Sequence, residues 1–371
     1  MSKFGKWVVG SIVLVVILVL AFGTRTEKET SPIKIGFVGP LTGDASSLGL
    51  ASRAAVEVAA DEVNAAGGLN GQKVEVIYED GKCSPLPATN AAQKLFNIDK
   101  VSGVIGGLCS GETSAFVKSA METKKIVVSY CSSAPPLSNS GKFFFRTYPS
   151  DALQGRYAAE YLYNDLGARK VALIYHISDY GSGLKEVFIN RFKELGGTVV
   201  AEEGVTADVR DYKTQLTKIK NTKPDYIYFA LYPEGATVVV KQIKDLGITA
   251  KLFASETFGD TKFLANLPKA IDILFTESVA NPTPDFAKKL LAKTGGDQVP
   301  TCAPQAYDAA QAVFAAIKQV GVSDPDKLSD AVRASDFQGV SGHIQFDQYG
   351  DVKNPAYRVR QIVNGSLVDL K

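Results

Sequence analysis

The sequence predicts an α/β fold made of two doubly wound lobes, each a parallel sheet flanked by helices. From Pro32 onward, short β-rich runs alternate with helical segments, which is typical of parallel strands joined by helices. The alternation occurs in two similar halves, separated by segment 132–141, whose Ser/Pro-rich composition excludes regular structure over most of its length. The helices and strands predicted after residue 279 are not enough to form a further lobe, and they do not all belong to one of the two halves. We therefore expect the chain to recross between the lobes and to form a ligand cleft where strand ends face one another.

The first half begins with a strand over 33–38 and a turn-rich segment over 39–44. A helix is predicted over 50–66, ended by Gly67 and Gly68. The later elements of this half are strands 73–78, 104–106 and 126–129 and helices 88–98 and 113–122. Ser110 follows strand 104–106 and is predicted to cap the helix beginning near Glu112, with its hydroxyl and free N–H groups available to an anion. For this motif alone, a plain helix cap is the commoner interpretation.

The second half repeats the pattern. Its predicted helices are 151–166, 184–195, 212–220 and 236–246, and its strands are 171–175, 198–201, 226–229, 252–254 and 271–276. The remaining chain predicts helices 286–293, 305–320 and 326–334 and strands 342–346 and 357–363. We assign residues 32–150 and 279–340 to lobe 1, and residues 151–278 and 341–371 to lobe 2.

The composition is that of an ordinary globular protein. A chain of 371 residues with 45% apolar and 22% charged residues is long enough for two domains with substantial cores. Lys and Arg total 41 against 39 Asp and Glu, so the charge balance gives no reason to expect nucleic acid or an anionic membrane surface as a partner.

The N-terminal segment 1–23 predicts export. Lys3 and Lys6 precede an unbroken apolar run over 7–22, and Ala21 and Gly23 are small residues at the positions that a signal peptidase requires. The run is long for a signal peptide and marginal for a membrane span, so a cleaved signal and an N-terminal membrane anchor both stay open. No cysteine lies near residue 23, which argues against the lipid-modified cysteine of bacterial lipoproteins; we treat 24–31 as a linker.

No motif of catalysis or metal binding is present. The nucleophile elbow, the phosphate loop, the dinucleotide fingerprint and the H-E-x-x-H zinc motif are all missing from the sequence. The two histidines, His176 and His343, have no partner at metal spacing, and neither lies near a predicted nucleophile. The four cysteines lack C-x-x-C spacing, and export permits disulfides in any of three pairings. We expect no metal, no cofactor and no enzyme activity; a hydrolase is a minority alternative.

Several short runs resemble a known family when they are taken in order. They are IKIG at 33–36, PLTG at 40–43, NAAGGLNG at 64–71, GLCS at 107–110, FRTYPSD at 145–151 and YGSG at 180–183. Together these runs resemble the leucine/isoleucine/valine-binding proteins, which are type I periplasmic binding proteins of ABC importers, over roughly residues 32 to 365. The resemblance implies two lobes joined by a multi-strand hinge, which trap an amino acid when they close.

The resemblance also implies which residues hold the head group of the amino acid. Ser110 matches the serine that binds the α-carboxylate, and Ser133 stands where the family uses Thr or Ser for the same group. The backbone carbonyl of Cys131 matches an acceptor for the ligand ammonium, and Glu256 matches the carboxylate that pairs with it. An ammonium buried by closure needs such a partner, because an unpaired buried charge is very costly. Taken alone, Ser133 is equally a loop serine.

Further positions match the pocket more loosely. Tyr180 and Tyr232 match tyrosines that reach the ligand from lobe 2, although each is also compatible with packing. Leu48 and Cys302 fall where the ligand side chain would lie and keep the pocket apolar, which favours an aliphatic amino acid without excluding an amide.

The resemblance implies one disulfide and leaves a second as a hypothesis. In the family, a bridge links the positions of Cys83 and Cys109. A second bridge between Cys131 and Cys302 is the further hypothesis, since both map to the same lobe near the pocket.

The resulting functional hypothesis is an extracytoplasmic substrate-binding protein that delivers a branched-chain or similar amino acid to ABC permease subunits. Its location would be the periplasm or the outer face of the cell membrane. The alternative is a membrane-anchored sensor ectodomain for an amino acid or amide. Only six residues precede the apolar run, so such a sensor would need a partner for signalling.

Overall fold

The computed structural model describes residues 31–259, 261–268 and 271–370. The chain divides into two units, Met1–Pro32 and Ile33–Lys371, and the second unit is the body described below. The predicted export segment 1–23 and linker residues 24–30 lie outside the described residues. Within the described ranges, no helix is long and apolar enough to cross a membrane.

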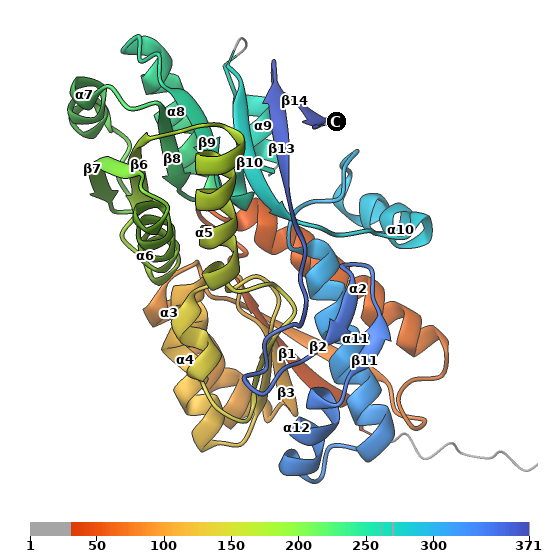
Figure 1. Cartoon of the computed structure of the whole chain (residues 1–371). Helices are drawn as coiled ribbons and strands as arrows, with labels where there is room; N and C mark the ends of the chain where they lie inside the picture. The colour runs from red at the N-terminus through yellow and green to blue at the C-terminus, as the bar shows by residue number, and fades with distance from the viewer. Residues whose placement is uncertain (1–30, 260, 269–270, 371) are drawn as a thin grey trace, which may run out of the picture. The chain divides into compact units, whose positions relative to one another are not determined.

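The first sheet has five parallel strands in the order β2, β1, β3, β4, β5, of which β1, β2 and β3 are labelled in Figure 1. They are β1 (Ile33–Gly39), β2 (Val74–Asp80), β3 (Gly103–Gly106), β4 (Ile126–Ser129) and β5 (Phe144–Arg146). The helices that cover it are α2 (Ser46–Ala65) and α11 (Ala303–Val320) on one face and α3 (Pro85–Gln93) and α4 (Ser110–Glu122) on the other. The strand order reverses between β1 and β3, so a crevice forms at the carboxyl ends of these strands.

The second sheet has seven strands in the order β14, β13, β10, β9, β8, β6, β7. They are β6 (Lys170–His176), β7 (Thr198–Val205), β8 (Tyr226–Ala230), β9 (Lys251–Ala254), β10 (Ile273–Ser278), β13 (Tyr357–Val363) and β14 (Ser366–Asp369). Strands β6 to β10 are parallel, and β13 and β14 run antiparallel at one edge. Its main helices are α5 (Asp151–Glu160), α6 (Asp179–Glu194), α7 (Lys213–Thr222) and α8 (Pro233–Asp245). Here the order reverses between β6 and β8.

Shorter elements connect these layers. They are η1 (Lys94–Asp99), η2 (Pro135–Asn139), η3 (Tyr161–Asp165), η4 (Glu256–Gly259), α9 (Thr261–Asn266), α10 (Pro284–Thr294), α12 (Pro325–Arg333), β11 (Asp336–Gln338) and β12 (His343–Gln345). Helix α10 packs on α2 and α12 packs on α11, so both belong with the first sheet.

The chain crosses between the two sheets after β5, after β10 and after β12. A buried ion pair ties the first crossing to the last. The Arg146 side chain is fully buried, and its Nε and Nη2 atoms lie 2.6 and 2.9 Å from the carboxylate oxygens of Asp351. Its Nη1 atom donates to the backbone carbonyl of Ala134 at 3.0 Å. Arg146 and Asp351 also form a backbone bridge, so these two hinge segments are joined by both main chain and side chain.

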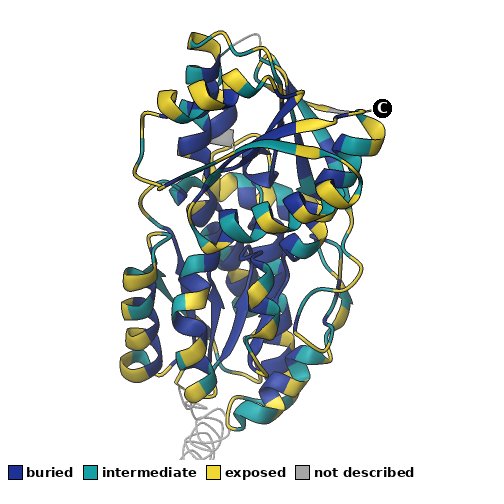
Figure 2. Ribbon diagram, turned by 60° about the vertical axis from the view of Figure 1, so that its left-hand side comes forward, coloured by how far each residue is buried: buried dark blue, intermediate teal, exposed yellow. Residues whose placement is uncertain are grey.

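The predicted fold class is confirmed: two doubly wound sheets share one chain that recrosses between them. The inner strands are buried along most of their length, as Figure 2 shows, while the outer faces of the helices are exposed. Such strands read as nearly continuous apolar runs, because helices cover both faces of a parallel sheet.

Some element boundaries differ from the prediction. Helix α6 begins at Asp179 rather than Leu184, because the Ser178 side chain accepts a hydrogen bond from the Gly181 N–H and caps the helix early. Strand β12 pairs with β11 and not with the second sheet. The strands that return to the second sheet therefore begin at β13, later than the start of the predicted segment 341–371.

Candidate functional site

A small cavity lies where the carboxyl ends of strands from the two sheets face each other. The space that the centre of a water molecule can occupy in it is about 20 Å³. The cavity therefore has room for roughly one water. The lining residues from lobe 1 are Leu48, Leu108, Cys109, Ser110, Cys131, Thr301 and Cys302, and those from lobe 2 are Tyr180, Tyr232, Glu256 and Thr257. Ligands bind at this edge in open α/β sheets.

The two lobes also contact each other directly through residues outside the cavity lining. Asp44 follows β1, Arg210 follows β7, and the Arg210 Nη2 atom lies 3.0 and 2.9 Å from the two carboxylate oxygens of Asp44. Gly183 in α6 faces Pro135 in η2, where a Cβ atom would come within 2.9 Å of the proline ring. The structure is therefore a closed state in which a glycine permits the close approach of the lobes.

The turn that carries Ser110 is held by a buried glutamate. Both carboxylate oxygens of Glu112 accept backbone N–H groups, from Cys83 at 2.8 Å, from Cys109 at 3.1 Å and from Leu108 at 3.2 Å. Burial raises the pKa of Glu112 to about 7, although these three N–H donors act in the opposite direction. The turn between β3 and α4 is thus fixed by a side chain from the helix itself.

The predicted capping role of Ser110 is wrong. Ser110 is the first residue of α4 and Cys109 is its N-cap, because Glu112 reaches back to the Cys109 N–H and does the capping. The Ser110 hydroxyl instead accepts the N–H of Ala134 at 3.1 Å and borders the cavity at the positive end of a 13-residue helix.

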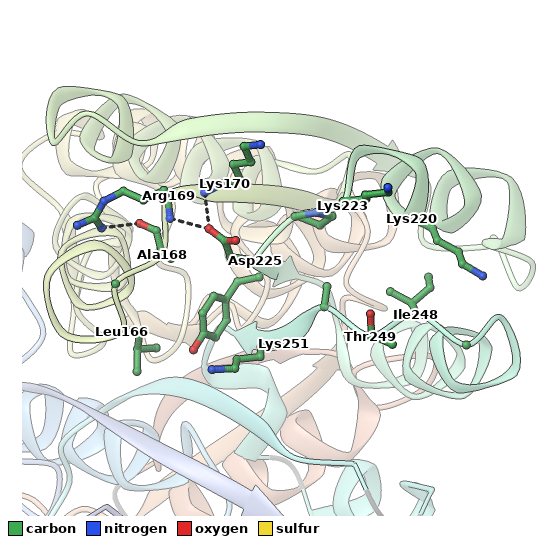
Figure 3. Close-up of a pocket in the computed structure, with 15 residues that line it drawn as sticks. Leu166, Ala168, Arg169, Lys170, Lys220, Lys223, Asp225, Ile248, Thr249 and Lys251 are labelled. Atoms are coloured by element: carbon green, nitrogen blue, oxygen red, sulfur yellow. Dashed lines mark hydrogen bonds between the residues drawn. The ribbon is translucent and has the colours of Figure 1, made fainter.

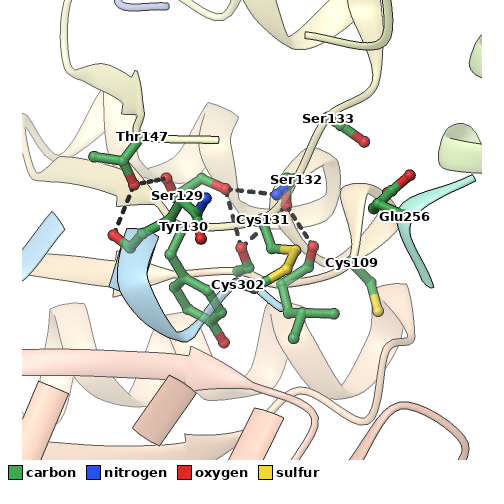
Figure 4. Close-up of a disulfide and its surroundings, with 12 residues drawn as sticks. Cys109, Ser129, Tyr130, Cys131, Ser132, Ser133, Thr147, Glu256 and Cys302 are labelled. Carbon is green, nitrogen blue, oxygen red and sulfur yellow. Dashed lines mark hydrogen bonds between the residues drawn. A yellow bond between two sulfur atoms is a disulfide. The ribbon is translucent and has the colours of Figure 1, made fainter. Parts of the chain in front are cut away.

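Ser133 does not line the cavity. Its hydroxyl donates to the Asp151 carboxylate at 2.8 Å, and its carbonyl accepts the Asp151 N–H at 2.8 Å. Neighbouring Cys131 does border the cavity, in the loop after β4. Figure 4 shows this loop, where Ser129 and Ser132 bond to the backbone of the facing turn and keep Cys131 in place.

Two disulfides are present, Cys83–Cys109 and Cys131–Cys302. The first ties the loop after β2 to the Ser110 turn. The second joins the loop after β4 to the start of α11, across 171 residues of sequence, and is drawn in Figure 4. Cys109, Cys131 and Cys302 all border the cavity, so both disulfides form part of its wall.

Glu256 supplies the carboxylate from lobe 2. It opens η4 directly after β9, is 3% exposed, and accepts hydrogen bonds from Gln154 Nε2 and, at 3.3 Å, from the Tyr180 hydroxyl. Burial raises its pKa, and these two hydrogen bonds oppose that rise.

Tyr180 and Tyr232 stack on each other in the wall, with ring centroids 5.5 Å apart. The Tyr180 hydroxyl also lies 2.7 Å from the Ser255 hydroxyl, so its one proton is shared between Ser255 and Glu256. Behind Tyr232, the His176 Nδ1 atom accepts the Tyr232 N–H at 3.1 Å, so the ring proton is on Nε2. Burial lowers the pKa of His176 to about 4, which keeps this ring neutral.

The structure brings together seven of the eight residues predicted to bind the ligand, and leaves Ser133 outside the wall. It adds Leu108, Cys109, Thr257 and Thr301, of which Cys109 was predicted only as a disulfide partner. Leu108, Thr257 and Thr301 are each adjacent in sequence to a predicted residue, which is Cys109, Glu256 and Cys302 respectively. Their position beside these residues is the only sequence signal that could have indicated them. Across the residues that the structure describes, no three His, Cys, Asp or Glu side chains are grouped so that they could hold a metal ion.

A larger groove of about 960 Å³ lies on lobe 2, at the starting ends of β6, β8 and β9 (Figure 3). Several lysines line it, and its acidic residue, Asp225, already accepts the N–H groups of Arg169 and Lys170 at 2.8 Å. This groove contains none of the predicted residues and lies at the edge of the sheet opposite to the one that α/β proteins use for ligands. The small cavity between the lobes is therefore the candidate site.

Comparisons with known proteins agree with this arrangement. The family model described as "Periplasmic binding protein" matches residues 32–366. The chain is 30% identical over 358 residues to an amino acid binding protein of Pseudomonas aeruginosa PAO1, with 94% of each chain covered. It is 28% identical over 336 residues to the leucine-, isoleucine-, valine-, threonine-, and alanine-binding protein of the same organism, with 87% of each covered. The solved leucine binding protein LivK of Thermotoga maritima has a TM-score of 0.83 at 28% identity, covering 91% of this chain and 97% of that one.

Proposed function

Because this chain belongs to the periplasmic binding protein family, and within it to the leucine/isoleucine/valine-binding proteins, we propose that it captures a branched-chain or similar amino acid for an ABC importer. It is a substrate-binding protein, and its family is not an enzyme family. The family implies an extracytoplasmic location, and we propose the periplasm or the outer face of the membrane.

One observation carries the proposal: Ser110 from lobe 1 and Glu256 from lobe 2 border the same cavity. These two groups suit the two ends of a zwitterion. The carboxylate of the ligand accepts the Ser110 hydroxyl and lies at the N-terminus of α4, where the helix dipole favours an anion. The ammonium lies against Glu256 and the carbonyl of Cys131. The Ser133 hydroxyl, predicted for the carboxylate, is bonded to Asp151 in this closed state.

The rest of the wall favours an aliphatic side chain. Leu48, Leu108 and the Cys131–Cys302 disulfide present apolar surface, and Tyr180 and Tyr232 add aromatic faces. An apolar group buried among them gains roughly 25 cal/mol for each Å² of apolar surface removed from water. Thr257 and Thr301 add hydroxyls, which are compatible with a small polar side chain as well.

Binding and closure are coupled in this mechanism. A ligand that contacts both lobes stabilises the closed state by its differential affinity, and the ABC permease then recognises the closed surface. The proposed partners are the amino acid and the permease subunits. The alternative of a sensor ectodomain is not favoured by the relatives, which are named as binding proteins.

A thermal-shift screen tests the function. Leu, Ile, Val, Ala and Thr should be compared with the corresponding amides, because a ligand that binds only the folded state raises the melting temperature by mass action. We expect free amino acids to raise it and amides to leave it unchanged, since an amide lacks the anionic end that Ser110 meets. A response to amides alone would contradict the assigned role of Ser110.

Calorimetric titration of variants tests the site. Glu256→Gln should weaken binding roughly ten- to a hundredfold, because a charge-assisted hydrogen bond contributes on the order of 1.5–3 kcal/mol. Glu203→Gln is the matched control, since Glu203 lies in β7 and pairs with Lys218 away from the cavity. Equal affinities for these two variants would remove Glu256 from the site.

A further inference from the structure

A second carboxylate lies behind Glu256. Asp151 is fully buried at the first position of α5, and Gln154, one turn further along the helix, donates to Glu256 Oε2. Asp151 accepts the Ser133 hydroxyl through Oδ2 at 2.8 Å. The two carboxylates are thus linked to one helix turn and interact electrostatically with each other. Two neighbouring buried carboxylates cannot both be ionised without a large unfavourable free energy, because the two negative charges repel each other and neither is solvated by water.

No cation neutralises this pair. Among the described residues, neither Asp151 nor Glu256 has a Lys, Arg or His within ion-pair distance. Arg146 is the cation that interacts electrostatically with Asp151, and this interaction stabilises the charged form of the Asp151 carboxylate. Its own Nε and Nη2 atoms, however, are bonded to Asp351, so its charge is already paired.

Several buried polar atoms around the pair have no partner within the described part of the chain. They are Asp151 Oδ1, Gln154 Oε1 and the hydroxyls of Tyr148, Tyr228 and Tyr357. The three tyrosines interact electrostatically with both carboxylates, and Tyr148 also with Glu277 on β10. Burial raises the pKa of each of these tyrosines well above its usual value, as it does for Tyr180, so all four stay neutral. Glu277 is paired with Arg358 on β13, whereas burial raises the pKa values of Asp151 and Glu256, which have no such partner among the described residues.

We propose that Asp151 and Glu256 hold one proton between them in the ligand-free protein, and that the ammonium of the bound amino acid displaces this proton into solvent. The proposal rests on the proposed function, because it needs an ammonium at Glu256. The charges balance: a pair with one proton carries a single negative charge, and an ionised pair beside one ammonium carries the same. Asp151 does not border the cavity, so it is a positioning residue that acts through Glu256, Gln154 and Ser133.

A defined pH dependence follows. Release of one proton on binding makes the affinity rise up to tenfold for each pH unit, as long as the free protein still holds the proton. A site with one permanently ionised carboxylate shows no such slope at neutral pH.

Calorimetric titration with leucine between about pH 5 and pH 8 tests this, repeated at each pH in phosphate and in Tris, whose ionisation enthalpies differ. For the native protein we expect a buffer-dependent enthalpy that corresponds to nearly one proton released per leucine where the affinity changes with pH. Asp151→Asn should abolish the release and flatten the pH profile. Asp308→Asn is the control: this buried carboxylate in α11 bonds to Val340 and Ser341, and its loss should leave the release intact.

Three outcomes overturn the proposal. Leucine binding with no buffer-dependent enthalpy at any pH would overturn the shared proton and leave the amino-acid site standing. Full proton release by Asp151→Asn would overturn the role of Asp151. Failure of leucine and the other amino acids to bind would overturn both the pair and the proposed function.

If Asp151→Asn does not fold, Ser133→Ala replaces it. The lost hydrogen bond to the ionised Asp151 should shift the pH profile of binding upward, and an unshifted profile would contradict the pair.

Discussion

The ion pair between Asp44 and Arg210 should tune ligand affinity although neither residue borders the cavity. The two residues belong to different lobes, so the pair forms only when the lobes close. Its free energy therefore enters the closure equilibrium, and through it the apparent dissociation constant of the ligand. Asp44→Asn removes the pair with little change in side-chain volume, and Arg210→Gln removes it with a shorter, uncharged side chain.

The structure sets the size of the effect. The side chains of Arg210 and Asp44 are 47% and 24% exposed, and one nitrogen contacts both carboxylate oxygens. Exposed pairs of this kind contribute about 0.2–1 kcal/mol after solvent screening. A value near 0.5 kcal/mol corresponds to roughly a twofold weaker affinity, seen mainly as faster dissociation. Salt near 1 M, where the screening length is about 3 Å, should reduce the difference.

A double-mutant cycle measured by calorimetry isolates the pair from other contacts. Arg210 also lies 3.6 Å from Glu234 in its own lobe, so the single variants alone do not report the contact with Asp44. Lys218→Gln, which breaks an ion pair within lobe 2, is the control and should bind ligand normally. Strictly additive single effects would refute the coupling, and a loss far above tenfold would mean that these residues contact the ligand.

Three further predictions concern stability and the site. Removing Cys131–Cys302 by a double Ala substitution should lower the free energy of unfolding by about 2–5 kcal/mol, since the bond closes 171 residues; an unchanged denaturant midpoint would contradict this. Glu112→Gln should cost about 1–3 kcal/mol in the same assay and weaken ligand binding, because an amide cannot accept all three N–H groups. His176 has a pKa of about 4 when folded against 6.5 unfolded, so unfolding takes up a proton and stability falls by roughly 3 kcal/mol as pH drops through this window. His176→Gln should reduce that fall, and an equal fall in both proteins would refute it.

The sequence was most informative where local patterns decide the structure. Strands such as β6 and β8 are buried on both faces, so their apolar runs stand out from the helices around them. Helix ends marked by glycine were also recognisable. Short elements such as β5, with three residues, are too short to show a hydrophobic periodicity. Their pairing also depends on strands that are distant in sequence.

The site could be predicted only in part, because long-range contacts select among residues with similar local patterns. Ser110 and Ser133 both follow a strand, but only Ser110 borders the cavity. Ser133 is turned toward Asp151 by two hydrogen bonds that no local pattern encodes. Asp151 itself reads in the sequence as the start of a helix, and its interaction with Glu256 depends on two segments that meet only in the folded chain.

The Cys131–Cys302 bond has a topological consequence. It encloses α5 to β10, the larger part of lobe 2, in a covalent ring, while β13 and β14 of the same sheet come from outside that ring. A protease that cuts once between residues 132 and 301 opens the ring and releases no fragment, so such a nick becomes visible on a gel only after reduction. The C-terminal strands also make lobe 2 inseparable by simple truncation, because excising the ring would leave its sheet without two edge strands.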